Sequence, residues 1–437
     1  MTAALTDQVD MQPADIPLAL YIHMPWCIKK CPYCDFNSHV VPDRQGAQQR
    51  LVEQSMSTLQ EASPSLGINA LFNQTSTPIS PDSALSAELE QAYLHALIKD
   101  AAQQQPLAQG RCISSIFIGG GTPSLISAKG YEWLFTQLKN LFLFSDDCEI
   151  TLEANPGTLE HQPFANYLAA GINRLSLGVQ TFNPAQLQRL GRVHNQEDAI
   201  QAIRRAREAG FNRVNVDLMH GLPEQTQAQA LHDLHTAITH GATHISWYQL
   251  TIEPNTVFFR TQPTLPDDDT LADIQQAGEE VLRQHGFVQY EVSAWAKEQP
   301  CRHNINYWQF GDYLAIGAGA HGKVTQTNGV YRFQKTRLPK DYLAQQPASM
   351  LHWQAIQAKD MPFEFMMNAL RLKEGVPHEF YAQRTGLSLD PLQPVLSQLR
   401  QRGLLVGNNL LSHSSRLQCT AQGFNYLNDV LGEFVDE

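Results

Sequence analysis

The sequence predicts an α/β fold, a partial (β/α)6 barrel followed by a small C-terminal helical, winged-helix-like domain. Short runs rich in β-branched and aromatic residues alternate with longer amphipathic stretches, which is the pattern of βαβ units. Each of six such runs is followed at once by a polar or glycine-rich signature. Because active sites of (β/α) barrels assemble from the carboxyl ends of the strands, the six signatures indicate one shared site.

The six strands are predicted where short apolar runs stop at polar turns, at Leu18–His23, Ser115–Ile118, Glu149–Glu153, Arg174–Val179, Arg213–Leu218 and His244–Leu250. Apolar residues at helical spacing between the strands predict amphipathic helices, at Leu89–Ala102, Ala128–Leu141, Gln196–Ala209 and Ala228–His240. A strand, helix, strand order of this kind favours a parallel sheet with its helices outside.

The chain of 437 residues is expected to divide into four regions. These are an N-terminal tail over 1–16, the barrel core over 17–260, a barrel-completing region over 261–358 and the C-terminal domain over 359–437. Residues 55–87, rich in Ser, Pro, Gln, Thr and Asn, are interpreted as a mobile insertion in the core. The C-terminal domain is predicted from helices at Pro362–Leu372, Pro377–Arg384 and Asp390–Arg402, a hairpin of Gly403–Val406 with Leu417–Thr420, and a closing helix at Ala421–Leu431.

Composition excludes several classes of function. The net charge of -12 argues against sequence-independent nucleic-acid binding, and the winged-helix-like tail has no basic stripe, so a lid or partner-docking role is favoured for it. No apolar run approaches the roughly 20 residues that span a bilayer, so an integral membrane protein is not expected, although peripheral association stays open. No hydrophobic N-terminal signal segment is recognised, and a reducing, cytoplasmic location is expected.

Three cysteines, Cys27, Cys31 and Cys34, follow the first predicted strand in Cys-x3-Cys-x2-Cys spacing. The spacing predicts a three-thiolate clamp for a [4Fe–4S] cluster with one iron left open. Two alternatives remain: a zinc site completed by His23 or His39, and a disulfide, which the odd total of seven cysteines disfavours. The other four cysteines are interpreted as packing residues.

The segment Tyr21–Asn37, with the sequence YIHMPWCIKKCPYCDFN, resembles the radical S-adenosylmethionine (SAM) superfamily. Within it, the chain resembles the branch related to oxygen-independent coproporphyrinogen III oxidase. The resemblance implies that the open iron chelates SAM and that an electron from the cluster can cleave it to a 5′-deoxyadenosyl radical. Phe36 stands where the oxidases carry a further cysteine, and in this the chain resembles the heme-chaperone branch.

The resemblance also implies a set of SAM-binding residues, which are Tyr21, Tyr33, Gly120, Gly121, Thr122, Glu153, Gln180, Arg192 and Asp217. The run Gly119–Pro123 resembles the loop that pairs with the SAM amino group, and Glu153 resembles the carboxylate that holds the ribose. Taken alone, the glycine run would be an ordinary turn. Glu153 and Asp217 could likewise form ion pairs with buried or neighbouring arginines, namely Arg174, Arg192 or Arg213.

The segment Cys301–Trp308 contains a His-Asn-x-x-Tyr pattern that resembles the heme-binding pattern of the heme-chaperone branch. His303, Asn304 and Tyr307 are therefore predicted to contact heme, since imidazole is a common axial ligand. The alternative is that His303 and Tyr307 only close a turn against the barrel. On this prediction, the region over 261–358 would also contact heme.

Two functions follow from the resemblance. The first is a heme chaperone that binds heme, a [4Fe–4S] cluster and SAM and delivers heme to apo-hemoproteins, respiratory ones among them. The second is an oxygen-independent coproporphyrinogen III dehydrogenase, which makes protoporphyrinogen IX by radical decarboxylation. Phe36 and the His-Asn-x-x-Tyr pattern favour the first. No catalytic residue is assigned, whether the chain is an enzyme stays open, and the resemblance also allows a homodimer.

Overall fold

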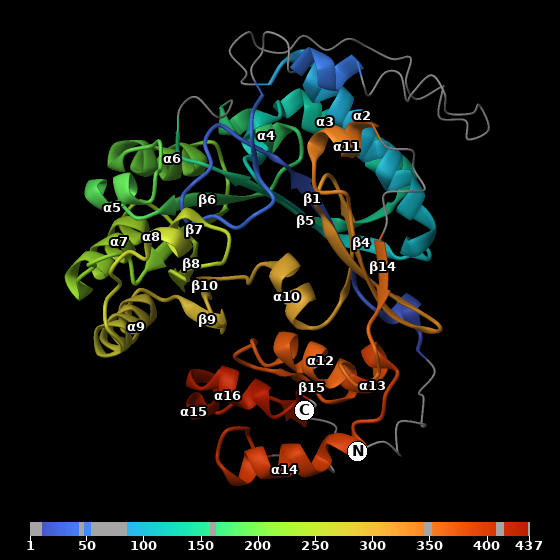
Figure 1. Cartoon of the computed structure of the whole chain (residues 1–437), viewed down its shortest axis with the longest axis vertical. Helices are drawn as coiled ribbons and strands as arrows, with labels where there is room; N and C mark the ends of the chain where they lie inside the picture. The colour runs from blue at the N-terminus through green and yellow to red at the C-terminus, as the bar shows by residue number, and fades with distance from the viewer. Residues whose placement is uncertain are drawn as a thin grey trace.

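The computed structural model describes residues 11–42, 48–53, 85–157, 163–344, 352–407 and 415–435. Its centre is a 12-stranded sheet with the order β14-β13-β12-β11-β1-β4-β5-β6-β7-β8-β10-β9 (Figure 1). The predicted insertion over 55–87 lies outside the described residues except for its last three positions. The limits of the four predicted regions stay a prediction.

The middle of the sheet is parallel. Its strands are β11 (Asp312–Ile316), β1 (Leu18–Met24), β4 (Cys112–Gly120), β5 (Leu143–Ala154), β6 (Arg174–Gln180), β7 (Arg213–His220) and β8 (His244–Gln249). The six predicted strands are confirmed, whereas β11 was not predicted. It lies beside β1 although some 290 residues separate them in the chain, and no local pattern reports so distant a pairing.

Alternating residues of β1 face opposite sides of the sheet, the hydrophobic core on one side and the barrel interior on the other. Leu18, Leu20 and Ile22 are buried in the main hydrophobic cluster together with residues of the covering helices. Tyr21 and His23 point to the other face, where the Tyr21 hydroxyl meets His23 Nδ1 at 3.0 Å. The strand therefore packs apolar side chains under the helices and presents polar ones to the barrel interior.

Helices cover the outer face of the sheet (Figure 1). They are α2 (Ala87–Gln104), α3 (Ala128–Leu141), α4 (Phe164–Ala169), α5 (Pro184–Arg189), α6 (Gln196–Glu208), α7 (Gln227–Thr239), α9 (Asp268–Gln284) and α11 (Pro339–Ala344). The short helix α8 (Val257–Thr261) lies instead against residues that follow β1, where the Phe258 N–H donates to the Pro32 carbonyl at 3.1 Å. The four predicted barrel helices are confirmed as α2, α3, α6 and α7. Side-chain caps begin them, and Asn195 and Thr226 form full capping boxes that satisfy the first free N–H groups of α6 and α7.

Antiparallel strands extend both edges of the sheet. β12 (His321–Gln326), β13 (Gly329–Gln334) and β14 (His352–Ala355) continue it from β11, and β10 (Ala294–Ala296) with β9 (Val288–Glu291) continues it from β8. All these strands come from the region that was expected to complete the barrel. In the described part of the chain the sheet does not close, because β14 and β9 each have a partner on one side only.

The C-terminal domain has a hydrophobic core of its own. It contains α12 (Met361–Ala369), β15 (Val376–Pro377), α13 (Glu379–Thr385), α14 (Gln393–Gln401), β16 (Arg416–Leu417), α15 (Ala421–Asn425) and α16 (Leu427–Gly432). The predicted hairpin is present as an antiparallel bridge between Leu405 and Cys419. Two helix predictions need correction: Pro377 pairs in a strand, so α13 begins at Glu379, and the closing helix breaks at Tyr426.

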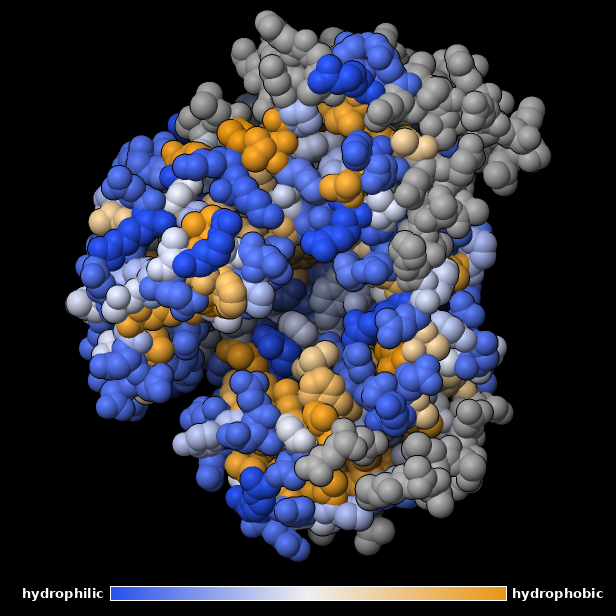
Figure 2. Space-filling model, viewed as in Figure 1, coloured by the Kyte–Doolittle hydropathy of each residue, from blue (hydrophilic) through white to orange (hydrophobic). Residues whose placement is uncertain are grey.

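Between the barrel and the C-terminal domain lies α10 (Arg302–Trp308), which packs against β1, β4, β11 and α12 (Figure 1). The surface is largely hydrophilic and is hollowed between the two parts (Figure 2). Among the described helices, none is long and apolar enough to cross a membrane.

Candidate cluster and cofactor site

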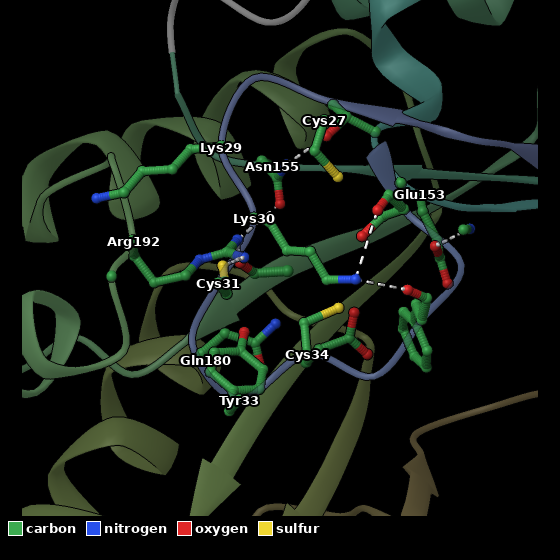
Figure 3. Close-up of a pocket in the computed structure, with 18 of the residues that line it drawn as sticks. Cys27, Lys29, Lys30, Cys31, Tyr33, Cys34, Glu153, Asn155, Gln180 and Arg192 are labelled. Atoms are coloured by element: carbon green, nitrogen blue, oxygen red, sulfur yellow. Dashed lines mark hydrogen bonds between the residues drawn. The ribbon is translucent and has the colours of Figure 1, made fainter. Parts of the chain in front are cut away.

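A cavity of about 440 Å³ opens at the carboxyl ends of the central strands. All three predicted cluster cysteines line this cysteine cavity. So does every predicted SAM residue except Tyr21, namely Tyr33, Gly120, Gly121, Thr122, Glu153, Gln180, Arg192 and Asp217. Figure 3 shows the cysteine side chains around the same space as Glu153 and Gln180. Residues spread over some 190 positions of the chain thus meet at one place.

The cysteines lie within residues 25–38, here called the cluster loop, which follow β1. Cys27 is part of the short strand β2 (Trp26–Cys27), which pairs with β3 (His39–Val40). Burial, with a smaller contribution from the nearby thiols of Cys34 and Cys31, raises the pKa of Cys27 to about 11. Arg192 Nη1 donates to Cys31 Sγ at 3.7 Å and so brings a positive charge beside the cluster loop. Neighbouring thiols make one another harder to ionise, because their thiolate charges repel. A positively charged iron–sulfur core placed among them would remove this repulsion.

The spacing of the thiols also bears on the zinc alternative. Within the described residues, no group of three His, Cys, Asp or Glu side chains is gathered closely enough to hold a single metal ion. A cubane binds its thiolates at separate iron corners and so needs them farther apart than one zinc ion would. His23 Nε2 meets the Asn37 carbonyl at 2.9 Å and Nδ1 meets Tyr21, so both of its ring nitrogens have partners. The residues present therefore fit a cubane cluster better than a zinc ion.

Backbone contacts hold the cluster loop to the sheet. The Asn37 carbonyl is bonded to His23 of β1, as described above. The side-chain amide of Asn37 also donates to the carbonyl of Ala318, a residue just after β11, at 3.0 Å. Lys30 Nζ donates to the carbonyls of Phe36 and Ser38 and folds the loop back on itself. The loop is thereby fixed at both β1 and β11, and this fixes where the thiols point.

The glycine loop lies directly against the cluster loop. The Gly121 N–H donates to the Met24 carbonyl at 2.6 Å, and the Thr122 N–H donates to the Trp26 carbonyl at 2.7 Å. A Cβ atom on Gly121 would lie 2.4 Å from the Trp26 oxygen, and one on Gly120 would lie 2.5 Å from the His23 ring. Gly120 also has φ +111°, which side chains disfavour. The run is therefore more than an ordinary turn, because only glycine permits this approach.

Two carboxyl groups, Glu153 and Asp217, line the cavity. Burial raises the pKa of Glu153 to about 8, with Asp217 adding to the shift. Burial likewise raises the pKa of Asp217, which accepts from Ser176 Oγ at 3.1 Å and Asn215 Nδ2 at 2.8 Å. Neither forms an ion pair within the described residues, and Arg213 pairs instead with Glu149 at 2.5 Å. Two buried acids without a paired cation suit a positively charged ligand, such as a sulfonium with an ammonium group.

Gln180 and Arg192 form the opposite wall. Gln180 has φ +71°, a left-handed conformation that is unusual for a residue with a side chain. Its Oε1 accepts from the Tyr248 hydroxyl at 2.8 Å, and Arg192 Nη2 donates to Asn155 Oδ1 at 2.6 Å. Asn155 and Tyr248 line the cavity but were not predicted. Asn155 could have been found within the Glu-Ala-Asn-Pro signature, whereas Tyr248 carries no signal except its place near the end of β8.

Tyr21 lies below the cavity rather than in its wall. Its ring stacks on Phe117 at a centroid distance of 6.5 Å, and its hydroxyl meets His23 as described above. Tyr21 is linked to the cluster loop through His23, which holds the Asn37 carbonyl.

The predicted heme residues lie apart from the cysteine cavity. His303 is 1% exposed, with Nδ1 at 3.1 Å from Ser115 Oγ and Nε2 at 2.9 Å from the Tyr307 hydroxyl. Burial lowers the pKa of His303 to about 3, so the imidazole is neutral near pH 7. Asn304 donates to the Tyr290 hydroxyl at 3.1 Å. In this conformation both ring nitrogens of His303 already have hydrogen-bond partners. This arrangement matches the alternative in which His303 and Tyr307 only hold a turn against the barrel.

An open parallel barrel with a three-cysteine loop at its strand ends defines the class of radical SAM proteins. Residues 21–237 match the family model described as "Radical SAM superfamily", and residues 356–425 match "HemN C-terminal domain". Coproporphyrinogen III oxidase (HemN) from Escherichia coli has a similar structure, with a TM-score of 0.71 over 96% of this chain and 90% of that chain. The two are 22% identical in sequence, so this likeness concerns the fold alone.

Two curated relatives are similar over nearly their whole length. The heme chaperone HemW of Haemophilus influenzae is 44% identical over 96% of this chain and 98% of its own. The heme chaperone HemW of Escherichia coli is 41% identical over 96% of this chain and 99% of its own. The chain belongs to the HemW family.

Proposed function

We propose that this protein is a heme chaperone that binds a [4Fe–4S] cluster and SAM in the cysteine cavity, binds heme, and delivers the heme to apo-hemoproteins. The observation that carries the proposal is the similarity to proteins named heme chaperone HemW along nearly the entire chain. Phe36, in place of the oxidases' additional cysteine, supports the same conclusion.

Each group in the cavity has a proposed role. Cys27, Cys31 and Cys34 hold the cluster, and Arg192 donates to the Cys31 sulfur. The glycine loop, which lines the same cavity, would contact the amino group of SAM, and the carboxyl groups of Glu153 and Asp217 would attract its positive groups. When bound, the cluster supplies the electron that can cleave SAM to a 5′-deoxyadenosyl radical.

The segment around α10 is the proposed heme region, with His303, Asn304 and Tyr307 as its predicted contacts. Direct binding of iron by His303 would require its ring to give up the bond to Ser115 or to Tyr307. The recipients of the heme, a cytoplasmic location and a homodimer belong to the proposal as well. They rest on the resemblance to the heme chaperones.

The deciding experiment begins with anaerobic reconstitution of the cluster. The protein is incubated with SAM, a reductant and coproporphyrinogen III, and the same preparation is then titrated with heme. Stoichiometric heme binding without formation of protoporphyrinogen is the expected result. Turnover to protoporphyrinogen would instead identify the second candidate, a coproporphyrinogen III dehydrogenase, and would contradict the chaperone proposal.

A further inference from the structure

A group of buried polar side chains lies beneath the cysteine cavity, inside the barrel. Asn215 and Asp217 are two positions apart on β7, so their side chains share the face that points into the barrel. In the sheet register, Ser176 of β6 and His244 of β8 lie beside Asn215. Asn215 is 2% exposed and His244 is 3% exposed, so these groups need partners within the protein.

Hydrogen bonds connect five of these side chains into one chain, here called the Asp217 chain. Asn304 Nδ2 of α10 donates to the Tyr290 hydroxyl of β9 at 3.1 Å, and that hydroxyl lies 2.9 Å from His244 Nε2. His244 Nδ1 lies 2.6 Å from Asn215 Oδ1, and Asn215 Nδ2 donates to Asp217 Oδ1 at 2.8 Å. The Asp217 chain therefore runs from α10 through the barrel interior to the wall of the cysteine cavity.

The bonds of the Asp217 chain all point in one direction. A carboxylate only accepts, so the Asn215 amide turns its NH2 group to Asp217 and its oxygen to His244, which must then carry its proton on Nδ1. Burial, with two nearby arginines adding to the effect, holds the pKa of His244 well below its usual value, so Nε2 accepts from the Tyr290 hydroxyl. Bonds aligned in this way polarise one another and strengthen the last bond, to Asp217.

Two serines secure the end of the Asp217 chain. Asn215 Nδ2 also donates to Ser176 Oγ at 2.7 Å, and the Ser176 hydroxyl donates to Asp217 Oδ2 at 3.1 Å. Ser246 Oγ donates to Asn215 Oδ1 at 3.1 Å and holds the amide oxygen on that side. Both oxygens of Asp217 thus accept from side-chain donors. Such donors favour the charged form of a carboxyl group and oppose the effect of burial.

The second carboxyl group of the cavity is supported differently. Glu153 Oε2 accepts from the Gly120 N–H at 3.2 Å, and burial, with Asp217 adding to the effect, raises the pKa of Glu153 to about 8. Asp217 can add to this shift only as an anion. Near pH 7 Glu153 is therefore mostly neutral, and Asp217 carries the negative charge of this wall.

We propose that Asn215, supported by His244 and Tyr290, is a positioning residue that holds the Asp217 carboxylate as the counter-ion of the sulfonium of SAM. This role rests on the proposed binding of SAM in the cysteine cavity and deepens it by naming what selects the charged ligand. Asp217 lines the cavity, whereas Asn215 and His244 act through it. A neutral thioether of nearly the same shape gains nothing from a fixed anion, so the Asp217 chain makes the cavity selective for the cation.

The test compares SAM with S-adenosylhomocysteine, its neutral thioether analogue, by anaerobic equilibrium dialysis of the full-length, reconstituted protein. The wild type should bind SAM about tenfold more tightly than the analogue. Asn215→Leu has a similar shape but no donor, and should weaken SAM about tenfold, the value of one hydrogen bond to a charged group. Its affinity for the analogue should stay within about twofold of the wild type, whereas general damage to the cavity would weaken both ligands alike.

A double-mutant cycle tests whether Asn215 acts through Asp217. Asp217→Asn removes the charge, keeps the shape and should abolish the preference for SAM over the analogue. Asn215→Leu added to this variant should weaken SAM no further, because the amide then has no anion to hold. Losses that simply add in the double variant would show that Asn215 acts independently of Asp217 and would overturn the proposal.

Two further variants keep the test decisive if Asn215→Leu does not fold. Tyr290→Phe removes a single hydroxyl from the middle of the Asp217 chain and should weaken SAM about threefold without affecting the analogue. Asn173→Leu is the matched control, because its amide bonds to the backbone of Cys148 and Ile150 outside the cavity. This control should keep the preference of the wild type for SAM.

The proposal is overturned if the wild type binds SAM and the analogue equally well and Tyr290→Phe changes neither affinity. A wild type that binds neither ligand would instead contradict the proposed binding of SAM in the cysteine cavity. The failure of the positioning role and the failure of the proposed function are therefore distinct results.

Discussion

At the scale of single residues, the cysteine cavity joins a basic wall to an acidic one. Arg192 lies beside the Cys31 sulfur, and Glu153 with Asp217 lies at the ends of β5 and β7. The guanidinium favours an anionic group beside it, whereas the buried acids favour a cationic ligand. One side of the cavity therefore suits the thiolates of a cluster, and the other side suits a positively charged sulfonium compound.

Substitution of one clamp cysteine tests the cluster assignment. Cys31→Ala should abolish the brown absorbance of the [4Fe–4S] cluster after anaerobic reconstitution, because a cubane held by two thiolates is not retained. The matched control is Cys112→Ala, which removes an exposed cysteine outside the cavity and should leave the absorbance unchanged. Equal absorbance in Cys31→Ala and the wild type would show that the clamp lies elsewhere.

The raised pKa of Glu153 predicts a pH-dependent stability for the apo protein. Folding raises the pKa from 4.5 to about 8, so the folded state binds this proton more tightly than the unfolded state. The stabilising contribution is therefore complete below 4.5 and is lost as the pH rises through about 8. In the wild type this loss in the free energy of unfolding is on the order of a few kcal/mol. Glu153→Gln has no titrating group at this position and should not show the loss.

Urea unfolding of both proteins at about pH 5 and about pH 8.5 measures the difference. The free energy of unfolding of the wild type should fall relative to that of Glu153→Gln between the two conditions. A constant difference at the two pH values would mean that Glu153 titrates normally.

At the scale of elements, the site depends on how strands end. β4 ends in glycines that let two backbones meet, and β6 ends at Gln180 with its left-handed φ. Both ends were visible in the sequence as polar or glycine-rich signatures after apolar runs. The contacts of these ends were not visible, because Gly121 meets Trp26 and Gln180 meets Tyr248 across large separations in the chain.

A methyl group on the glycine loop tests the close approach. Gly121→Ala would place its Cβ 2.4 Å from the Trp26 carbonyl oxygen, a backbone atom that cannot simply turn aside. We expect a loss of about 1–3 kcal/mol in the free energy of unfolding, together with weaker SAM binding by the reconstituted protein. Urea unfolding and equilibrium dialysis with labelled SAM measure the two effects.

Gly432→Ala is the control for this variant, because no atom lies within 4 Å of the added Cβ in α16. Its free energy of unfolding should stay within about 0.5 kcal/mol of the wild type. Should both glycine variants behave alike, the approach of the glycine loop to the cluster loop would not matter for stability.

At the scale of the whole molecule, a buried carboxylate joins distant parts of the sheet. Asp312, at the start of β11, accepts from Arg111 at 2.8 Å and from Lys323 of β12 at 2.9 Å. Burial by itself would raise the pKa of Asp312, but the two cations hold it below its usual value. The carboxylate thereby fastens β11 and β12 to the segment that precedes β4.

Removal of that carboxylate should be costly. Asp312→Ala leaves two buried cations without a partner, so the free energy of unfolding should fall by about 3–5 kcal/mol in urea titrations near pH 7. Arg283→Ala breaks only the surface pairs with Glu279 and Glu280 on α9 and should cost less than about 1 kcal/mol. A similar small loss for both would indicate that the buried network contributes little.

The sequence by itself determined the periodic elements and the chemistry-bearing motifs. The parallel strands β1, β4, β5, β6, β7 and β8, the barrel helices and the cysteine spacing were predicted because hydrophobic period and ligand spacing are local properties. The likeness of Tyr21–Asn37 to radical SAM proteins could also be recognised from the sequence, because the motif is one continuous segment. Nearly all of the predicted cavity residues then met at the strand ends, as parallel connectivity requires.

Only the tertiary structure decided which face each residue presents and what surrounds it. It placed β11 beside β1, moved Tyr21 below the cavity, and showed that the ring nitrogens of His303 are already bonded. It also revealed a second cavity beside α10, whose walls come from three separate stretches of the chain. Burial and pairing depend on contacts between residues far apart in the sequence, and no pattern within a single segment reports them.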